Sequence, residues 1–282
     1  MLTPPPPPTR VIAVANQKGG VGKTTTVVNL AAALAARRKT VLVVDLDPQA
    51  NATSGLGVEP KEGVSLYGAL MRIADVNDFI VGTAVDRVNL IPSEVNLAGV
   101  EIELARMDDH LGGVRKVLKP VVDSKVFDYI LVDCPPSLGV LMSNALAAAD
   151  AVLVPMQCEY YAMEGLSVIL KLVERMRATG ANPGLRVEGI AMTMYSRTRL
   201  ADDVVAQVRE HYGDAVYKTV VPRSVRAGEA PSYGIPLVAY APSTPVAQAY
   251  FILANEFLAR QKALAAADGK VDSLPPKSGA IA

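Results

Sequence analysis

The sequence predicts an α/β fold in which a twisted, mainly parallel sheet is covered by helices on both faces. Short apolar runs alternate with amphipathic helical patterns at the spacing of βαβ units. Several of these runs end in an acidic residue, and the first leads into a glycine-rich loop. Parallel neighbours need crossover connections, which are usually helices, so this alternation favours one sheet between two helical layers.

The expected elements follow one another in a regular order. Strands are predicted near residues 11–15, 41–45, 88–91, 129–133, 151–155 and 187–193, with a short one near 216–221. Helices are predicted near residues 24–37, 109–122, 139–148, 162–178, 199–211 and 244–264. Residues 55–86 contain only mixed, short helical signals, and the chain has no internal repeat.

The composition is that of one globular domain, since half of the 282 residues are hydrophobic and can form a large core. No apolar run approaches the roughly 20 residues of a membrane span. The two cysteines, Cys134 and Cys158, favour a reducing cytoplasm over a disulfide framework. We expect the domain to cover residues 10–266, between a disordered proline-rich leader (1–9) and a disordered polar tail (267–282).

The loop after the first strand has the residues of a phosphate-binding loop. Gly19, Gly20 and Gly22 allow backbone N–H groups to converge on phosphate oxygens at the positive end of a helix. Lys23 supplies a charge for the β- and γ-phosphates, and the Thr24 hydroxyl is placed to bind Mg²⁺. The residues expected to hold ATP are Lys18, Gly19, Gly20, Val21, Gly22, Lys23, Thr24 and Thr25. The sequence therefore predicts a P-loop site.

Two further strands end in acidic residues, at the edge where parallel sheets bind ligands. Asp45 and Asp47 follow the second strand, and Asp133 ends the strand at 129–133 before a Pro-Pro pair. We expect Asp133 to serve Mg²⁺ directly or through water. Asp47 is placed to polarise the attacking water, and Asp45 to orient the loop or the water shell of the metal.

The glycine-rich loop departs from the general P-loop pattern, because Gln17 replaces the usual first glycine and a second lysine, Lys18, opens the loop. KGGVGKTT (18–25) resembles the deviant Walker A motif of the ParA/MinD class of P-loop ATPases. Residues 155–165 are similar to the matching segment of chromosomal ParA (Soj) proteins. The resemblance implies a single-domain P-loop NTPase that forms an ATP-dependent sandwich homodimer. In that dimer Lys18 would reach the partner's phosphates as an arginine finger does, and Lys18, Lys23 and Asp47 would be catalytic.

The charge distribution limits how the chain could bind DNA. Basic and acidic residues both number 28, so no global field attracts a polyanion, although residues 171–226 hold ten basic and six acidic residues. Arg197, Arg199, Arg223 and Arg226 lie in two loops that resemble places where ParA proteins contact the DNA backbone. Each of the four could instead be an ordinary surface or ion-paired arginine.

Two local features bear on those loops. Ile235 and residues 243–245 stand where relatives carry basic residues, which reduces the expected positive patch. The Pro222–Arg223 turn is also expected to bind the nucleotide, close to the adenine. Doubling the patch in a dimer would compensate, because each neutralised phosphate adds to affinity.

The resemblance implies a chromosome or plasmid partition ATPase, cytoplasmic and associated with the nucleoid. Its ATP-bound dimer would bind double-stranded DNA without reading the sequence, and a ParB-type partner would stimulate hydrolysis and release. The main competing interpretation is a ParA-like ATPase that positions a different cargo, such as a protein cluster or compartment.

Two more classes of P-loop protein fit the residues less well. A MinD-like membrane ATPase needs a bulky amphipathic anchor, whereas helix 244–264 ends in alanines typical of core packing, so no membrane partner is expected. A reductase with a bridging iron–sulfur cluster needs two cysteine ligands per subunit, and no cysteine precedes residue 134.

Overall fold

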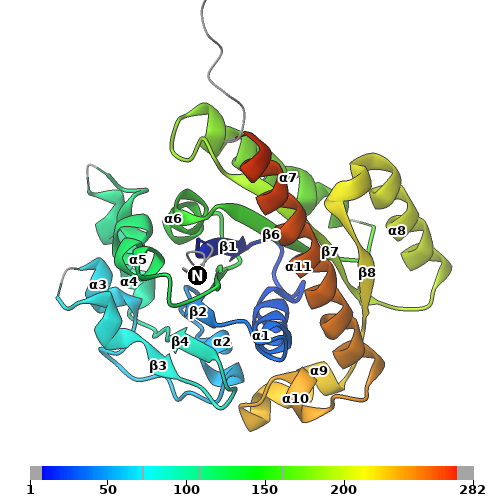
Figure 1. Ribbon diagram of the computed structural model, residues 1–282, viewed down its shortest axis with the longest axis horizontal. Coiled ribbons are helices and arrows are strands. Elements are labelled where there is room, and N and C mark those ends of the chain that lie inside the picture. Colours follow the sequence, from blue (N-terminus) through cyan, green and yellow to red (C-terminus); the bar gives the residue numbers. More distant parts are fainter. Residues whose placement is uncertain (1–7, 72, 108, 161, 272–282) are drawn as a thin grey trace, which may run out of the picture.

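The computed structural model describes residues 8–71, 73–107, 109–160 and 162–271, with side chains described as far as residue 267. These residues form an eight-stranded sheet of order β3-β4-β2-β5-β1-β6-β7-β8 (Figure 1). Neighbouring strands are parallel except β3 and β4, which are antiparallel. The predicted α/β class and the mainly parallel sheet are confirmed.

Every predicted strand is present. The strands are β1 (Arg10–Val14), β2 (Val41–Asp45), β3 (Val81–Gly82), β4 (Val88–Ile91), β5 (Tyr129–Asp133), β6 (Ala151–Gln157), β7 (Arg186–Tyr195) and β8 (Val216–Pro222). β2 and β5 are buried along their whole length, as expected for continuous apolar runs at the centre of a parallel sheet. β6 and β7 are longer than predicted because they pair with each other along most of their length.

Helices cover both faces of the sheet, as the sequence predicts. The α-helices are α1 (Lys23–Ala35), α2 (Asn51–Gly55), α3 (Leu66–Leu70), α4 (Leu97–Ala105), α5 (Gly113–Ser124), α6 (Val140–Ala148), α7 (Ala162–Ala178), α8 (Arg199–Tyr212), α9 (Arg226–Glu229), α10 (Leu237–Tyr240) and α11 (Pro245–Val271). Single 3₁₀ turns are η1 (Val76–Phe79), η2 (Gly213–Ala215) and η3 (Ala230–Tyr233). One core cluster joins the sheet to α4–α8, and a second joins it to α1 and α11.

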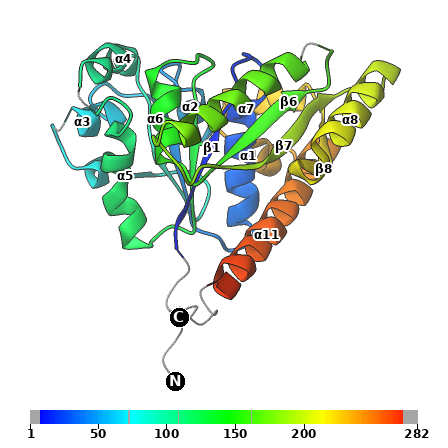
Figure 2. The ribbon, with the colours of Figure 1, turned by 90° about the horizontal axis from the view of Figure 1, so that it is seen from above.

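Helix α11 is the longest element and runs beside β8, as Figure 2 shows. Thr244 receives a hydrogen bond from the Ala247 amide (3.4 Å) and Pro245 is the first helical residue, which together fix the predicted start. Tyr250 and Phe257 are fully buried, so the apolar face of this helix is part of the core, as expected. Among the described residues, no helix has the length and apolar character needed to cross a bilayer.

The two ends of the domain differ slightly from the prediction. Thr9 donates a hydrogen bond to the Phe127 carbonyl (2.7 Å), so packing begins before residue 10. At the other end α11 continues to Val271, so residues 267–271 are helical rather than part of a disordered tail. The remaining leader and tail residues, 1–7 and 272–282, lie outside the described residues.

The middle of the chain shows what the sequence patterns missed. α4 was not predicted, although Leu97, Val100 and Leu104 are buried at helical spacing. α5 begins at Gly113 rather than 109, because residues 109–112 form a turn closed by a hydrogen bond from the Gly112 amide to the Asp109 carbonyl (3.2 Å). The poorly readable segment 55–86 contains α3, η1 and β3.

Candidate nucleotide-binding site

The loop between β1 and α1 has the conformation that phosphate binding requires. Gly20 and Gly22 have φ values of +73° and +86°, which other residues rarely adopt. Gly22 caps α1 without a side-chain hydrogen bond, and the first turn of the helix has no acidic residue. A Cβ atom built on Gly19 or Gly20 would meet nothing within 4 Å, so the space before the loop is open. The helix therefore offers free amides to an anion.

Lys23 is the buried cation of this loop. It is only 7 % exposed, and its Nζ donates a hydrogen bond to the Lys18 carbonyl (3.2 Å). Burial lowers the pKa of the Lys23 ammonium, whereas the negative charge of Asp133 and, more weakly, Asp47 acts to raise it. Lys23 is therefore held inside the loop with two carboxylates close to its ammonium group.

Asp133 is an incompletely satisfied buried carboxylate. It is fully buried at the end of β5, in register with Asp45 on β2, and neither of its oxygens has a hydrogen bond of standard geometry. Burial, followed by the charge of Asp45, raises the pKa of Asp133 well above its usual value, while the nearby Thr24 hydroxyl acts to lower it. A buried carboxylate beside a hydroxyl and without donors fits a Mg²⁺ ion.

Asp45 is occupied by protein donors. It accepts hydrogen bonds from the Thr53 amide (2.8 Å), the Thr53 hydroxyl (2.7 Å) and the Asp47 amide (3.2 Å). Burial raises its pKa to about 6, against the effect of these donors. Of the two roles expected for Asp45, the structure favours orientation of the loop. Thr53 was not identified from the sequence, and no pattern around it signals this contact.

Asp47 lies in the same acidic cluster but is less constrained. It is 7 % exposed, and its Oδ1 accepts a hydrogen bond from the Gln49 amide (3.0 Å). The next residues turn sharply, because Ala50 has a φ of +53° before α2. Such strain in a non-glycine residue is frequent at functional sites. The charge of Asp47 acts on the pKa values of Lys23 and Asp133, so the three side chains belong to one charged cluster.

Lys18 has a different environment from Lys23. Its side chain is 38 % exposed, and its Nζ forms an ion pair with Glu159 (2.8 Å) on the segment between β6 and α7. The Lys18 amide donates to Asn16 Oδ1 (3.0 Å), and Asn16 Nδ2 donates to the Pro155 carbonyl (2.8 Å). The two lysines of the loop therefore have separate positions, one in the cradle and one at its entrance. The role of Glu159 was not predicted.

The Pro222–Arg223 turn lies beside the P-loop. A cavity of about 240 Å³ is lined by Gly22 and Thr25 on one side and by Pro222 and Arg223 on the other. A second cavity of about 300 Å³ is lined by Thr24, Thr25, Asn29, Asn51, Pro231 and Pro236, among others. The Pro222–Arg223 turn therefore lies close enough to the P-loop to contact a nucleotide there, which is compatible with the expected contact near the adenine. The cavity lined by Pro231 and Pro236 was not predicted from the sequence.

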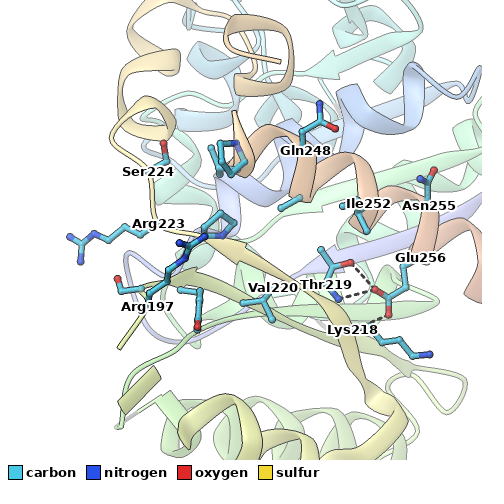
Figure 3. Close-up of a pocket in the computed structure, with 16 residues that line it drawn as sticks. Arg197, Lys218, Thr219, Val220, Arg223, Ser224, Gln248, Ile252, Asn255 and Glu256 are labelled. Atoms are coloured by element: carbon cyan, nitrogen blue, oxygen red, sulfur yellow. Dashed lines mark hydrogen bonds between the residues drawn. The ribbon is translucent and has the colours of Figure 1, made fainter. Parts of the chain in front are cut away.

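The four predicted DNA-contacting arginines are all exposed but not equivalent. Arg197 and Arg223 line one large groove, and Figure 3 shows the Arg223 side chain extending outward from it. Arg199 is the first residue of α8. Arg226 forms an ion pair with Glu229 (2.8 Å), one turn further along α9. The structure therefore brings two of the four arginines together and gives a third a partner of its own.

Neither of the two cysteines is exposed on the surface of the described structure. Cys134 and Cys158 are free and buried, and burial raises the pKa of both thiols, that of Cys158 to about 11. Across the described ranges, no group of three or more His, Cys, Asp or Glu side chains has the arrangement of a metal site.

Comparisons with known proteins identify the family of the chain. A family model described as an AAA domain matches residues 9–187. The sporulation initiation inhibitor protein Soj of Bacillus subtilis is 48 % identical over 78 % of this chain and 87 % of its own. The chromosome partitioning protein ParA of Caulobacter vibrioides is 46 % identical over 79 % and 84 %.

The fold of the chain is also similar to that of a solved structure. The cobyrinic acid a,c-diamide synthase of Mycobacterium smegmatis, with a bound ATP analog and magnesium, matches with a TM-score of 0.78. It is 36 % identical, and the match covers 90 % of this chain and 96 % of that one. The identities to Soj and ParA extend over most of both chains. The chain therefore belongs to the Soj/ParA family of chromosome-partitioning ATPases.

Proposed function

We propose that this ATPase partitions DNA through an ATP-dependent sandwich homodimer that binds double-stranded DNA without sequence preference. ATP and Mg²⁺ are its cofactors. The observation that supports the dimer is the separation of the two loop lysines: Lys23 is buried in the cradle, whereas Lys18 is exposed at the loop entrance. One triphosphate needs only one of them for binding, so the exposed lysine is available to a second copy.

Within one subunit, the chain's own groups perform binding and orientation. Backbone N–H groups of residues 19–25 hold the phosphates, and Lys23 offsets their charge. Thr24 and Asp133 would hold Mg²⁺, which when bound would neutralise phosphate charge. Asp47 orients the attacking water, while Asp45 and Thr53 fix the backbone that carries Asp47.

Lys18 acts across the dimer in this proposal. Its Nζ leaves Glu159 and contacts the phosphates bound by the partner, where it stabilises the charge of the transition state. Breaking the Lys18–Glu159 ion pair costs little free energy, because an ion pair between exposed side chains contributes only about 0–1 kcal/mol. Dimer formation therefore completes the catalytic site and couples hydrolysis to assembly.

DNA binding follows from the same assembly. A single subunit has no net charge and offers few unpaired cations around Arg197, Arg199, Arg223 and Arg226. Two subunits double the number of phosphate contacts, and each contact adds a counterion-release contribution. A ParB-type partner would stimulate hydrolysis, dissolve the dimer and release the DNA, so the protein is cytoplasmic and nucleoid-associated while ATP is bound.

Size-exclusion chromatography with light scattering tests the dimer. We expect a dimer with a slowly hydrolysed ATP analogue and Mg²⁺, and a monomer with ADP or without nucleotide. Lys18→Ala should bind the analogue and remain a monomer, whereas Lys39→Ala, a change at a lysine outside the loop, should dimerise as the wild type does. Equal dimerisation of the Lys18→Ala variant would contradict the proposed cross-dimer role.

A further inference from the structure

A large groove lies between the edge strand β8 and the first half of α11, and the nucleotide site does not use its floor. Its volume is about 1020 Å³. Apolar side chains of Val220, Pro222, Val246, Ala249 and Ile252 line it, and Figure 3 shows Ile252 projecting from α11 between Gln248 and Asn255. Ile252 is 56 % exposed although it is large and apolar. Val220 and Pro222 are half-buried, and Val246 and Ala249 are buried, so Ile252 is the most exposed apolar side chain of the groove. An exposed apolar side chain in a hollow with a polar rim is typical of an interaction site.

The rim of this groove is positively charged. Arg197, Lys218 and Arg223 line it, and within the described part of the chain none of the three side chains takes part in an ion pair. The acidic residue among the lining side chains is Glu256. Its carboxylate accepts hydrogen bonds from the amides of Lys218 (2.7 Å) and Thr219 (3.1 Å). These bonds engage Glu256 with the backbone, which leaves Arg197, Lys218 and Arg223 as the charged side chains that line the groove beside its apolar residues.

The first part of the exposed edge of β8, residues 216–219, is occupied by side chains of the protein itself. Glu256 takes the Lys218 and Thr219 amides, as the dashed lines in Figure 3 show. Arg260 Nη2 donates to the Val216 carbonyl (3.0 Å), and Arg209 Nη2 donates to the Lys218 carbonyl (2.8 Å). An extended peptide therefore finds few free backbone groups along residues 216–219. Recognition in this groove has to depend on side chains, which favours a helical ligand.

We propose that this groove docks an acidic amphipathic helix of a partner protein. Apolar residues on one face of that helix cover Ile252 and Val220, and flanking carboxylates pair with Lys218 and the two arginines. DNA fits the groove less well, because phosphate contacts on the rim leave the apolar floor exposed to water. Arg197 and Arg223 also belong to the proposed DNA surface, so the helix excludes DNA; this last step rests on the proposed function.

The test uses the full chain with selectively labelled isoleucine methyl groups. The probe is a synthetic peptide of about 15 residues, the length at which isolated helices become marginally stable, with Leu at helical spacing and Glu beside them. We expect the Ile252 methyl resonance to shift and saturate with this peptide, while those of exposed Ile73 and Ile102 stay in place. A counterpart with Lys in place of each Glu should leave Ile252 unchanged.

Three variants locate the contact. Lys218→Glu and Ile252→Glu should each raise the Kd for the acidic peptide by about tenfold or more. Val126→Glu, a matched change at a residue that is 62 % exposed in the turn before β5, should not alter it. Because Lys218 is not among the predicted DNA contacts, Lys218→Ala should weaken binding of the peptide more than binding of a DNA duplex.

Each result decides for or against the groove. The proposal is overturned if the Ile252 methyl resonance does not shift with the acidic peptide, or if it shifts equally with the lysine counterpart. A duplex alone that shifts Ile252 as strongly as the peptide assigns the groove to DNA instead. If the peptide binds as expected and no DNA binding occurs with ATP, the docking groove stands and the DNA-partition proposal fails.

Discussion

The phosphate site and the arginine loops are built on opposite principles. At the phosphate site, Lys23, Asp45 and Asp133 are buried, and their positions are set by strand ends and the first turn of α1. In the loops, Arg197 and Arg223 are exposed, and neither forms an ion pair within the described residues. A preorganised, desolvated site depends strongly on each member, whereas exposed cations contribute small and additive increments. On the proposed function, the chemistry would therefore depend on a few buried residues, and DNA affinity would be spread over many exposed ones.

The largest effect is expected at the buried cation. Lys23→Ala removes the ammonium that faces the phosphates and leaves the Asp133 carboxylate without its neighbouring positive charge. ATP affinity should fall on the order of 10²-fold or more, because charged hydrogen bonds in dry sites are worth about 1.5–3 kcal/mol each. Equilibrium binding of a fluorescent ATP analogue measures this. Lys18→Ala is the control and should retain binding; equal losses in both variants would remove the distinction between the two lysines.

The next largest effect is expected on the rate of ATP hydrolysis, with ATP binding unchanged. Asp47→Ala should leave ATP and Mg²⁺ bound while turnover falls on the order of 10²-fold, as expected for loss of a group that positions or activates water. The variant should accumulate as an ATP-locked dimer, detectable by light scattering after incubation with ATP. If the Asp47→Ala variant hydrolysed ATP at the wild-type rate, the attacking water would have to be positioned by backbone groups and Asp133 instead.

Smaller, graded effects are expected from the arginines. Arg197→Ala should weaken binding of every duplex several-fold and reduce the salt slope by about one contact per site, with ATPase activity in the absence of DNA unchanged. Arg223→Ala should also disturb ATP binding, because Arg223 lines the nucleotide cavity. Arg226→Ala should have the weakest effect, since Glu229 already neutralises that side chain. Anisotropy titrations at several salt concentrations rank the three; a dominant Arg226 would show that the ion pair opens on DNA.

The smallest effect is expected at the Lys18–Glu159 pair. Glu159→Gln releases Lys18 from an exposed ion pair worth about 0–1 kcal/mol, so ATP-dependent dimerisation should strengthen by about two- to fivefold. Analytical ultracentrifugation of this variant, with Glu164→Gln on α7 as the matched control, provides the comparison. Weaker dimerisation would mean that Glu159 positions Lys18 for its partner rather than retaining it.

Sequence patterns predicted the part of the molecule that depends on neighbouring residues. Central strands such as β2 and β5 appear as unbroken apolar runs that end in acids, and the P-loop places its glycines and lysines within one short segment. Lys23, Asp47 and Asp133 were predicted as site residues in this way, and the resemblance to ParA/MinD proteins added Lys18.

Contacts between distant segments could not be predicted in the same way. Glu159 meets Lys18 across 141 residues of sequence, and Thr53 satisfies Asp45 only because α2 folds back on β2. The groove between β8 and α11 combines residues of both elements with the turn after β7, and none of them signals a groove by itself. α4 was missed because its helical pattern is short and includes Gly99.

One titration tests the central claim that ATP assembles a DNA-binding dimer from two weak patches. Fluorescence anisotropy of a labelled duplex is followed with ATP and Mg²⁺, with ADP and Mg²⁺, and without nucleotide, and unrelated duplexes are added as competitors. We expect binding with ATP alone, a steep loss of affinity with salt, and equal competition by every duplex. Equally tight binding without ATP, or a strong preference for one sequence, would contradict it.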